Sequence, residues 1–115
     1  MGKTNGLHAL ELAHLLVKEI LEAVALFPAD APPGLRKQLC DAANSVAANI
    51  AEGFGRATLT ERPYFLRISR GSLEETQSHW KVSRRASYVA ENRFFRVWNF
   101  TMVLHRMIAK LSRKT

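Results

Sequence analysis

Residues 7–34 read LHALELAHLLVKEILEAVALFPADAPPG, a long helical pattern that breaks abruptly at a proline. Apolar residues recur in it at alternating spacings of three and four, which is typical of a helix packed in a bundle. Proline cannot continue a helix, so Pro28 and the turn leading to Gly34 predict a chain reversal after a helix over 7–27. The expected apolar stripe is Leu10, Ala13, Val17, Ile20, Val24 and Phe27.

The next segment predicts a thin helix over 34–52, with Pro33 suited to its first turn. Alanines flank its apolar face, so neighbouring helices can approach closely. We expect Gly53 and Gly55 to end this helix, because glycine adopts the left-handed conformation without a Cβ penalty. The expected apolar face is Leu35, Leu39, Ala42, Val46 and Ile50.

A third helix is predicted over 60–86, because a cap at Thr60 would leave Pro63 in the first turn, where proline is tolerated. Its expected inner face is small and polar, flanked by Leu73 and Trp80. Gly71 is costly in the middle of a helix, so we expect it to permit a close helix contact. The inner face would comprise Phe65, Ile68, Ser72, Thr76, His79 and Ser83.

A fourth helix is predicted over 91–113, where heptad spacing returns. With no strand alternation and only short connections, the pattern predicts an all-α fold, a single antiparallel up-and-down four-helix bundle occupying residues 1–115 as one domain. The expected core stripe of the fourth helix is Phe94, Val97, Thr101, Leu104, Ile108 and Leu111.

The first and fourth helices carry more apolar residues than one bundle core needs. This surplus indicates a homo-oligomer with a subunit interface, although a broad core seam would explain it equally well. The candidate interface residues are Leu12, Leu16, Phe95, Trp98 and Met102.

The single cysteine, Cys40, excludes an intrachain disulfide and favours a reducing compartment. No apolar run is long enough to span a membrane, and the N-terminal pattern lacks the features of a signal peptide. We therefore expect a cytoplasmic protein without a membrane partner.

Charge is distributed unevenly along a chain whose net charge is +7. Residues 1–52 hold four Lys/Arg and six Asp/Glu, whereas residues 53–115 hold thirteen Lys/Arg and four Asp/Glu. Such asymmetry points to a polyanionic partner, the alternative being a basic surface that only maintains solubility.

Five cations of the third helix fall within one sector of about 100° when the chain advances about 100° per residue. They are Arg67, Arg70, Lys81, Arg84 and Arg85, and only Glu74 interrupts the sector. Arginine suits bidentate contacts with phosphate, so this stripe predicts nucleic-acid binding, against the alternative of a solvated face. Four arginines near the helix ends extend the candidate patch: Arg56, Arg62, Arg93 and Arg96.

No constellation in the sequence predicts catalysis. The histidines lack metal-ligand spacing and Cys40 has no second cysteine, so we expect no metal and no cofactor. A polar cluster is predicted between the second and third helices, where it would fix the helix register or, in a small enzyme, form an active site. Its members would be Ser45, Asn49, Glu52, Ser72, Glu75, Thr76 and His79.

The segments NSVAANIAEG at 44–53, YFLRI at 64–68 and GSLEE at 71–75 resemble the four-helix-bundle family first noticed as reading frames inside intervening sequences of bacterial large-subunit ribosomal RNA genes. The resemblance covers nearly the whole chain. It implies a left-handed up-and-down bundle, often a pentameric ring, and structural roles for the matching residues. Those residues are Asn49, Glu52, Gly53, Gly71 and Glu75.

A related branch, the accessory variability determinants of diversity-generating retroelements, binds nucleic acid and a reverse transcriptase. The chain departs from the family pattern where Cys40-Asp41 and Ala47 replace a basic pair and a proline, and where Ala86-Ser87-Tyr88 replaces Leu-Gly-Tyr. We expect a non-enzymatic, basic, oligomeric bundle that binds RNA or DNA as an accessory to a nucleic-acid enzyme such as a reverse transcriptase. The alternative is a protein-interaction scaffold.

Overall fold

The computed structural model describes residues 2–114, with side chains from residue 6 to residue 113. This part of the chain forms four long helices and no strand, which confirms the predicted all-α bundle. The helices are α1 (Gly2–Ala25), α2 (Pro33–Gly55), α3 (Arg62–Arg85) and α4 (Glu91–Lys114).

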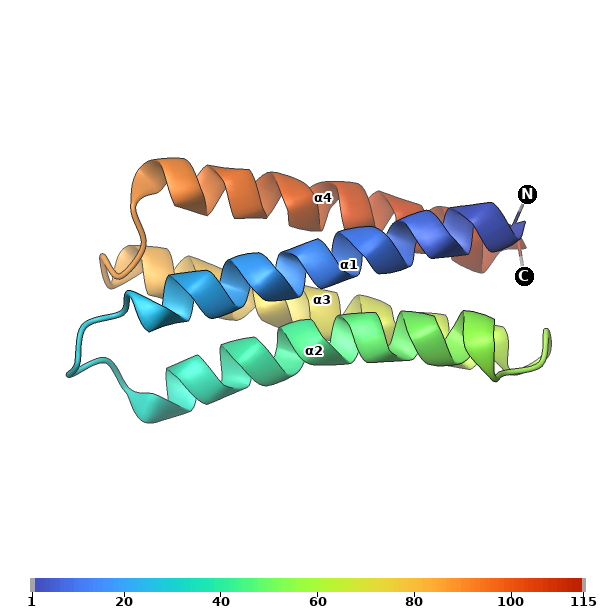
Figure 1. The fold of residues 1–115 in the computed structure, drawn as a ribbon, viewed down its shortest axis with the longest axis horizontal. Helices are drawn as coiled ribbons and strands as arrows, with labels where there is room; N and C mark the ends of the chain where they lie inside the picture. The colour runs from blue at the N-terminus through green and yellow to red at the C-terminus, as the bar shows by residue number, and fades with distance from the viewer. Residues whose placement is uncertain (1, 115) are drawn as a thin grey trace.

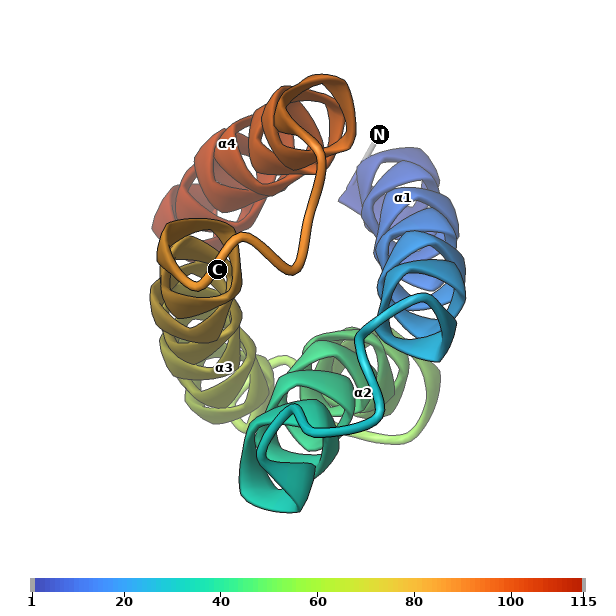
Figure 2. The same ribbon diagram turned by 90° about the vertical axis from the view of Figure 1, so that its left-hand side faces the viewer.

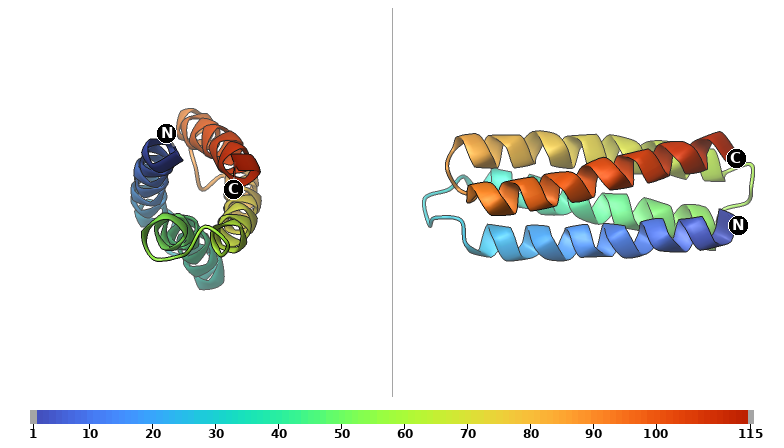
Figure 3. Two further views of the ribbon diagram at one scale, coloured as in Figure 1. Left: turned by 90° about the vertical axis from the view of Figure 1, so that its right-hand side faces the viewer. Right: turned by 90° about the horizontal axis from the view of Figure 1, so that it is seen from above.

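The four helices run alternately up and down along a body of 45 × 24 × 17 Å (Figure 1). Viewed end-on, α1, α2, α3 and α4 follow one another around the bundle, so each helix packs against two neighbours (Figure 2). The start of α1 and the end of α4 lie at the end of the bundle that also carries the α2–α3 connection, while the other two connections lie at the opposite end (Figure 3). None of the described helices carries an apolar run that could cross a lipid bilayer.

The core stripes of α2 and α4 match the predicted heptad positions, except that Leu35 and Phe94 at the starts of the two stripes are only partly buried. On α1 the stripe is rotated towards Leu16, which is completely buried, while Leu10, Val17 and Val24 are only partly buried. Leu16 therefore belongs to the core, and its prediction as a subunit-interface residue is wrong. The apolar pattern of α1 is wider than the core contact, and only packing against neighbouring helices decides which part faces inward.

The inner face of α3 is also rotated relative to the prediction. Phe65, Ile68, Ser72 and His79 are half-buried at the edge of the contact, whereas Thr76 and Ser83 are buried as expected. The largest apolar side chains of α3 decide the rotation, because their burial removes more apolar surface from water. The completely buried residues are Leu66, Ser69, Leu73, Thr76, Trp80 and Ser83.

Gly53 and Gly55 do not end α2 in the predicted way, since neither glycine has a positive φ and both lie within the helix. A Cβ at Gly53 would lie 3.4 Å from the Cβ of Phe65 on α3, so this glycine permits close packing of the two helices. The helix ends one residue later at Arg56, where the N–H groups of Arg56 and Ala57 both donate to the carbonyl of Glu52.

A capping box closes the turn that precedes α3, and the predicted cap at Thr60 is wrong, since the N-cap residue of α3 is Glu61. The N–H of Glu61 donates to Thr58 Oγ1 at 3.2 Å, and the N–H of Thr58 donates to Glu61 Oε1 at 2.8 Å. The helix itself begins at Arg62, so Pro63 lies in its first turn, as expected.

The end of α3 is a Schellman motif built around a serine. Ser87 has a φ of 66°, in the left-handed region that favours glycine. The N–H of Tyr88 donates to the carbonyl of Ser83, and the N–H of Ser87 donates to that of Arg84, which satisfies two terminal carbonyls. Ser87 thus occupies the position for which the family pattern has glycine.

Candidate nucleic-acid interface

The outer side of α3 carries four exposed cations, Arg67, Arg70, Lys81 and Arg85, which we call the basic face. Among the described residues, the three arginines make no ion pair or side-chain hydrogen bond. Lys81 differs, because its ammonium lies 5.1 Å from the ring centroid of Trp98 on α4. The basic face therefore presents unpaired positive charge to solvent along most of α3.

Gly71 lies on the same outer side of α3. The prediction that it permits a close contact within the chain is wrong, because a Cβ built at this position would have no atom within 4 Å. A glycine in the middle of a helix costs about 1 kcal/mol relative to alanine, and no packing within the bundle offsets this cost. The backbone of α3 is consequently open to approach from outside beside Arg67 and Arg70.

Arg84, included in the predicted stripe, is engaged within the chain. Its guanidinium donates to the carbonyl of Val89 at 3.0 Å and lies 3.7 Å from the carboxylate of Glu91. These contacts join α3 to the start of α4, so the half-buried Arg84 supports the connection and is less available to a ligand than its neighbours.

The two arginines of α4 in the predicted patch, Arg93 and Arg96, point towards Glu19 on α1. Arg96 lies 2.9 Å from Glu19 Oε1 and Arg93 lies 3.9 Å from the same atom. Because Glu19 belongs to α1, this cluster forms a bridge between α1 and α4. The structure therefore does not join these two arginines to the α3 stripe.

At the opposite end of the bundle, Arg62 and Arg56 flank the α2–α3 connection. Arg62 donates through Nε to the carbonyl of Gly53 at 2.9 Å, and its guanidinium stacks 4.3 Å from the centre of the Phe54 ring. Arg56 is exposed and lies 3.6 Å from Glu52. Arg62 thus stabilises the connection, while Arg56 remains accessible.

Sequence reasoning missed three exposed cations on the described part of α4, namely Arg106, Lys110 and Arg113. Arg106 and Arg113 follow Phe95 and Met102 in a helical repeat. The successive spacings from Phe95 to Met102, from Met102 to Arg106 and from Arg106 to Arg113 are seven, four and seven residues, so these four side chains share one side of α4. This repeat was visible in the sequence, but its relation to α3 depends on the helix order. It adds positive charge to the surface beside the basic face.

Glu74 interrupts the basic face and is bound across the helix pair. Its Oε2 lies 3.1 Å from Nε2 of His105 on α4. This contact and the hydrogen bond from Gln77 to Thr101 Oγ1 at 3.0 Å tie α3 to α4 beneath the surface charges. The acidic group is therefore already engaged within the chain.

The predicted polar cluster between α2 and α3 forms in part. The hydroxyls of Ser45 and Ser72 are 2.8 Å apart, and Asn49 Nδ2 donates to Ser45 Oγ at 3.1 Å and to its carbonyl at 2.9 Å. His79 instead contacts Glu75 on its own helix at 3.5 Å. The hydroxyls and the imidazole are thus engaged with different partners, an arrangement that suits helix registration.

The thiol of Cys40 is a poor nucleophile in this setting. Burial, and to a smaller extent the Asp41 carboxylate, raise the pKa of the Cys40 thiol above its usual value. The reactive thiolate is therefore disfavoured at neutral pH. Among the described residues, no group of three His, Cys, Asp or Glu side chains is arranged to hold a metal ion.

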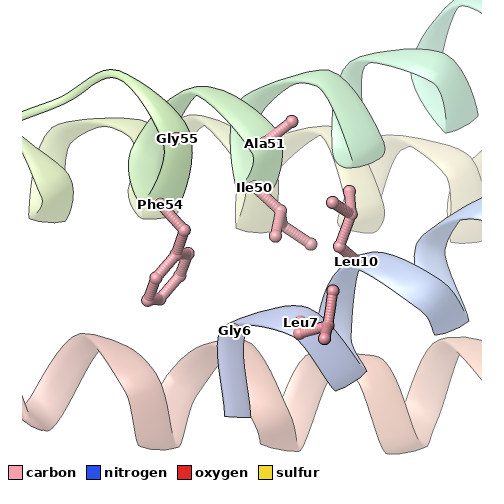
Figure 4. Close-up of a pocket in the computed structure, with 7 residues that line it drawn as sticks. All are labelled: Gly6, Leu7, Leu10, Ile50, Ala51, Phe54 and Gly55. Carbon is pink, nitrogen blue, oxygen red and sulfur yellow. The ribbon is translucent and has the colours of Figure 1, made fainter. Parts of the chain in front are cut away.

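Two hollows lie on the α1 side of the bundle, away from α3. One of about 440 Å³ lies between the start of α1 and the end of α2, where Phe54 and Ile50 point towards Leu7 and Leu10 (Figure 4). The other, of about 410 Å³, lies between α1 and α4 and is lined by Leu12, Arg96, Asn99, Phe100 and Val103. Both are largely apolar, and neither adjoins the basic face.

The predicted interface residues take different positions. Phe95 and Met102 are exposed by 53% and 41%, whereas Leu12 and Trp98 are half-buried. Leu12 lines the α1–α4 hollow, while Trp98 and Met102 contact side chains of α3. The four residues are therefore divided between the α1–α4 hollow and the side of α4 next to α3.

The fold and these surfaces define a small up-and-down helical bundle with a basic outer face. The chain belongs to the 23S rRNA-intervening sequence protein family, whose model matches residues 5–110, and this confirms the resemblance noted in the sequence. A similar solved structure is a protein of unknown function from the S23 ribosomal protein family of Bacteroides thetaiotaomicron VPI-5482. The TM-score is 0.85 at 14% identity, with 95% of this chain and 98% of that chain covered, so the likeness concerns the fold. No curated protein matches the chain.

Proposed function

We propose that this protein binds nucleic acid through the basic face of α3 and catalyses no reaction itself. The observation that carries the proposal is the group of three exposed arginines, Arg67, Arg70 and Arg85, without an acidic partner among the described residues. Cations aligned along one helix face repel one another unless an anion screens them. A polyphosphate backbone supplies such a row of anions and releases counterions on binding.

RNA is the preferred ligand in this proposal, because the family description refers to intervening sequences of 23S rRNA. An accessory role beside a nucleic-acid enzyme, such as a reverse transcriptase, is a further part of the proposal and rests on the family resemblance. The arginine guanidinium groups can bind RNA and DNA alike, since they contact phosphate oxygens in bidentate geometry and do not distinguish ribose from deoxyribose.

The decisive experiment measures binding of a labelled RNA and a matching DNA across a salt titration. The test variant is Arg67→Glu/Arg70→Glu, and the matched control is Lys18→Glu/Lys37→Glu on α1 and α2, which changes the net charge equally. We expect at least tenfold weaker binding for the test variant. Loss of two phosphate contacts should reduce the slope of log affinity against log salt by about 1.4 for a single strand.

The control variant should bind nearly as tightly as the unmodified protein, since its altered charges lie outside α3. Undetectable binding of the unmodified protein at low salt would refute the proposal. Equal losses in both double variants would show that net charge, and not the basic face, governs binding.

We propose in addition that the protein forms a homo-oligomer, a pentamer by family resemblance, through α1 and α4. Supporting this, Leu15 and Val103 are exposed by 47% and 40%, and Leu12 and Phe100 line the hollow between the two helices. Light scattering should give a molar mass several times that of one chain, reduced by Leu15→Glu/Val103→Glu. A monomer before mutation would contradict this part of the proposal.

A protein-interaction scaffold is the second candidate function. Leu7, Leu21 and Leu26 on or after α1 are exposed by 49% to 70%, which suits contact with another apolar surface. Capture of an acidic protein that survives nuclease treatment, combined with absent nucleic-acid binding, would favour the scaffold.

A further inference from the structure

Three aromatic side chains form a stack that runs from the core towards the surface between α3 and α4. Trp80 is completely buried and lies nearly parallel to Phe94, with centroids 6.1 Å apart and planes at 8°. Phe94 is in turn nearly parallel to Trp98, with centroids 5.8 Å apart and planes at 17°. The indole N–H of Trp80 donates to the carbonyl of Phe94, so the inner end of the stack is fully satisfied.

The outer end of this aromatic stack reaches the basic face. Lys81 places its ammonium over the ring of Trp98 at 5.1 Å. Phe95 packs edge-on against Phe94 with centroids 5.1 Å apart, yet 53% of it remains exposed. A cation and accessible aromatic rings thus lie together beside the C-terminal half of α3.

This combination matches what single-stranded nucleic acid requires. Proteins that bind single strands unite a positively charged track for the backbone with aromatic rings on which unpaired bases stack. In a duplex, the faces of the bases are stacked on one another and unavailable. An exposed phenylalanine beside a row of arginines therefore favours an unpaired strand.

The shape of the bundle disfavours sequence reading in a duplex groove. The major groove of B-DNA is about 12 Å wide, which admits one helix. Here α3 lies between α2 and α4, and the shorter dimensions of the bundle are 24 and 17 Å. Only the outward side of α3 is free, so a duplex would meet it through external phosphates alone.

We propose that the ligand of the basic face is a single strand of RNA or DNA, which extends the proposed function and rests on it. The strand backbone follows Arg67, Arg70 and Arg85, which span about 27 Å of α3 at about 1.5 Å per residue. Near Lys81 one base turns inward and stacks on the exposed ring of Phe95. The open backbone at Gly71 accommodates the strand where it passes beside Arg67 and Arg70.

The test compares a single strand with the same sequence in a duplex, using fluorescence anisotropy at fixed salt. A 16-nucleotide RNA without self-complementarity, its DNA equivalent and the corresponding duplexes serve as probes. We expect Phe95→Ala and Phe95→Leu to weaken single-strand binding by about fivefold to a hundredfold, which corresponds to one stacked base. Phe95→Tyr should retain the affinity, because it preserves the ring.

Duplex affinity should be unchanged in all three variants of Phe95. If single strand and duplex bind equally and Phe95→Ala has no effect, while Arg67→Glu/Arg70→Glu still reduces binding, then the single-strand inference fails and the proposed function stands. If no probe binds at low salt, both fail. If Phe95→Ala alters the oligomeric state and leaves affinity unchanged, Phe95 is an interface residue and the inference is again overturned.

Discussion

The side of α3 that faces α2 and the side that faces solvent differ in how their polar groups are satisfied. Towards α2, Ser69 donates to the carbonyl of Val46 at 2.9 Å, and Ser72 pairs with Ser45 at 2.8 Å. Towards solvent, Arg67 and Arg70 have no partner among the described side chains. On the side facing α2, these polar side chains have hydrogen-bond partners within the chain. On the side facing solvent, the guanidinium groups of Arg67 and Arg70 have none among the described residues.

The glycines of the two sides show the same difference. Gly53 on α2 lies against Phe65, where an added Cβ would be in van der Waals contact at 3.4 Å, whereas Gly71 faces open space. Both lower the intrinsic stability of a helix, but only Gly53 is offset by packing in the bundle. This contrast separates residues that maintain the fold from residues whose role requires another molecule, and it can be tested by substitution.

The largest effect is expected from overpacking the α2 side. Ser69→Leu introduces a bulky side chain at a completely buried position, so we expect the free energy of unfolding to fall by about 1–3 kcal/mol. The matched control, Ser78→Leu, lies on the exposed side of α3 and should change stability little. Urea unfolding followed by circular dichroism measures both, and equal losses would show that the two sides do not differ in packing.

A smaller effect of opposite sign is expected at Gly71. Gly71→Ala should stabilise the bundle by about 1 kcal/mol, since the new methyl group meets no neighbour. Gly53→Ala should give a smaller gain, because its Cβ would already be in contact with Phe65 at 3.4 Å. If the strand crosses α3 at Gly71, the alanine should also weaken nucleic-acid binding, as anisotropy would reveal. A destabilised Gly71→Ala would contradict the open position of this residue.

The fold was largely predictable from the sequence because heptad periodicity and proline positions act locally. The boundaries of α4 and the first-turn prolines of α2 and α3 illustrate this. The part of a wide apolar stripe that enters the core was not predictable, as Leu16 and the inner face of α3 show. Which apolar residues face the core depends on how the helix packs against its neighbours. The apolar pattern of one helix carries no information about that packing.

The candidate site was predictable only as a set of charges. Arg84, Arg93 and Arg96 resemble Arg67 in sequence, but the fold directs the first to Val89 and Glu91 and the other two to Glu19. Their partners are on other elements, so spacing along one helix cannot reveal them. The aromatic stack was missed because Trp80 and Phe94 meet only when α3 and α4 pack together.

The smallest change in stability is expected at Ser87. This residue tests whether a more stable helix α3 alone affects nucleic-acid binding. The left-handed conformation of a non-glycine residue costs about 1–2 kcal/mol, and glycine would remove this cost. Glycine also gives the unfolded chain more conformational entropy, which offsets part of the gain in stability. Ser87→Gly should therefore stabilise the protein by about 0.5–1 kcal/mol, measured as a rise in Tm of a few degrees.

Ser87 lies beyond the end of α3, outside both sides compared above. Its glycine variant should resemble Gly71→Ala in stability but bind nucleic acid like the unmodified protein. If both stabilised variants bound more weakly, binding would depend on the flexibility of α3 and not on close approach at Gly71. A loss confined to Gly71→Ala would place the ligand on the open backbone at Gly71, beside Arg67 and Arg70.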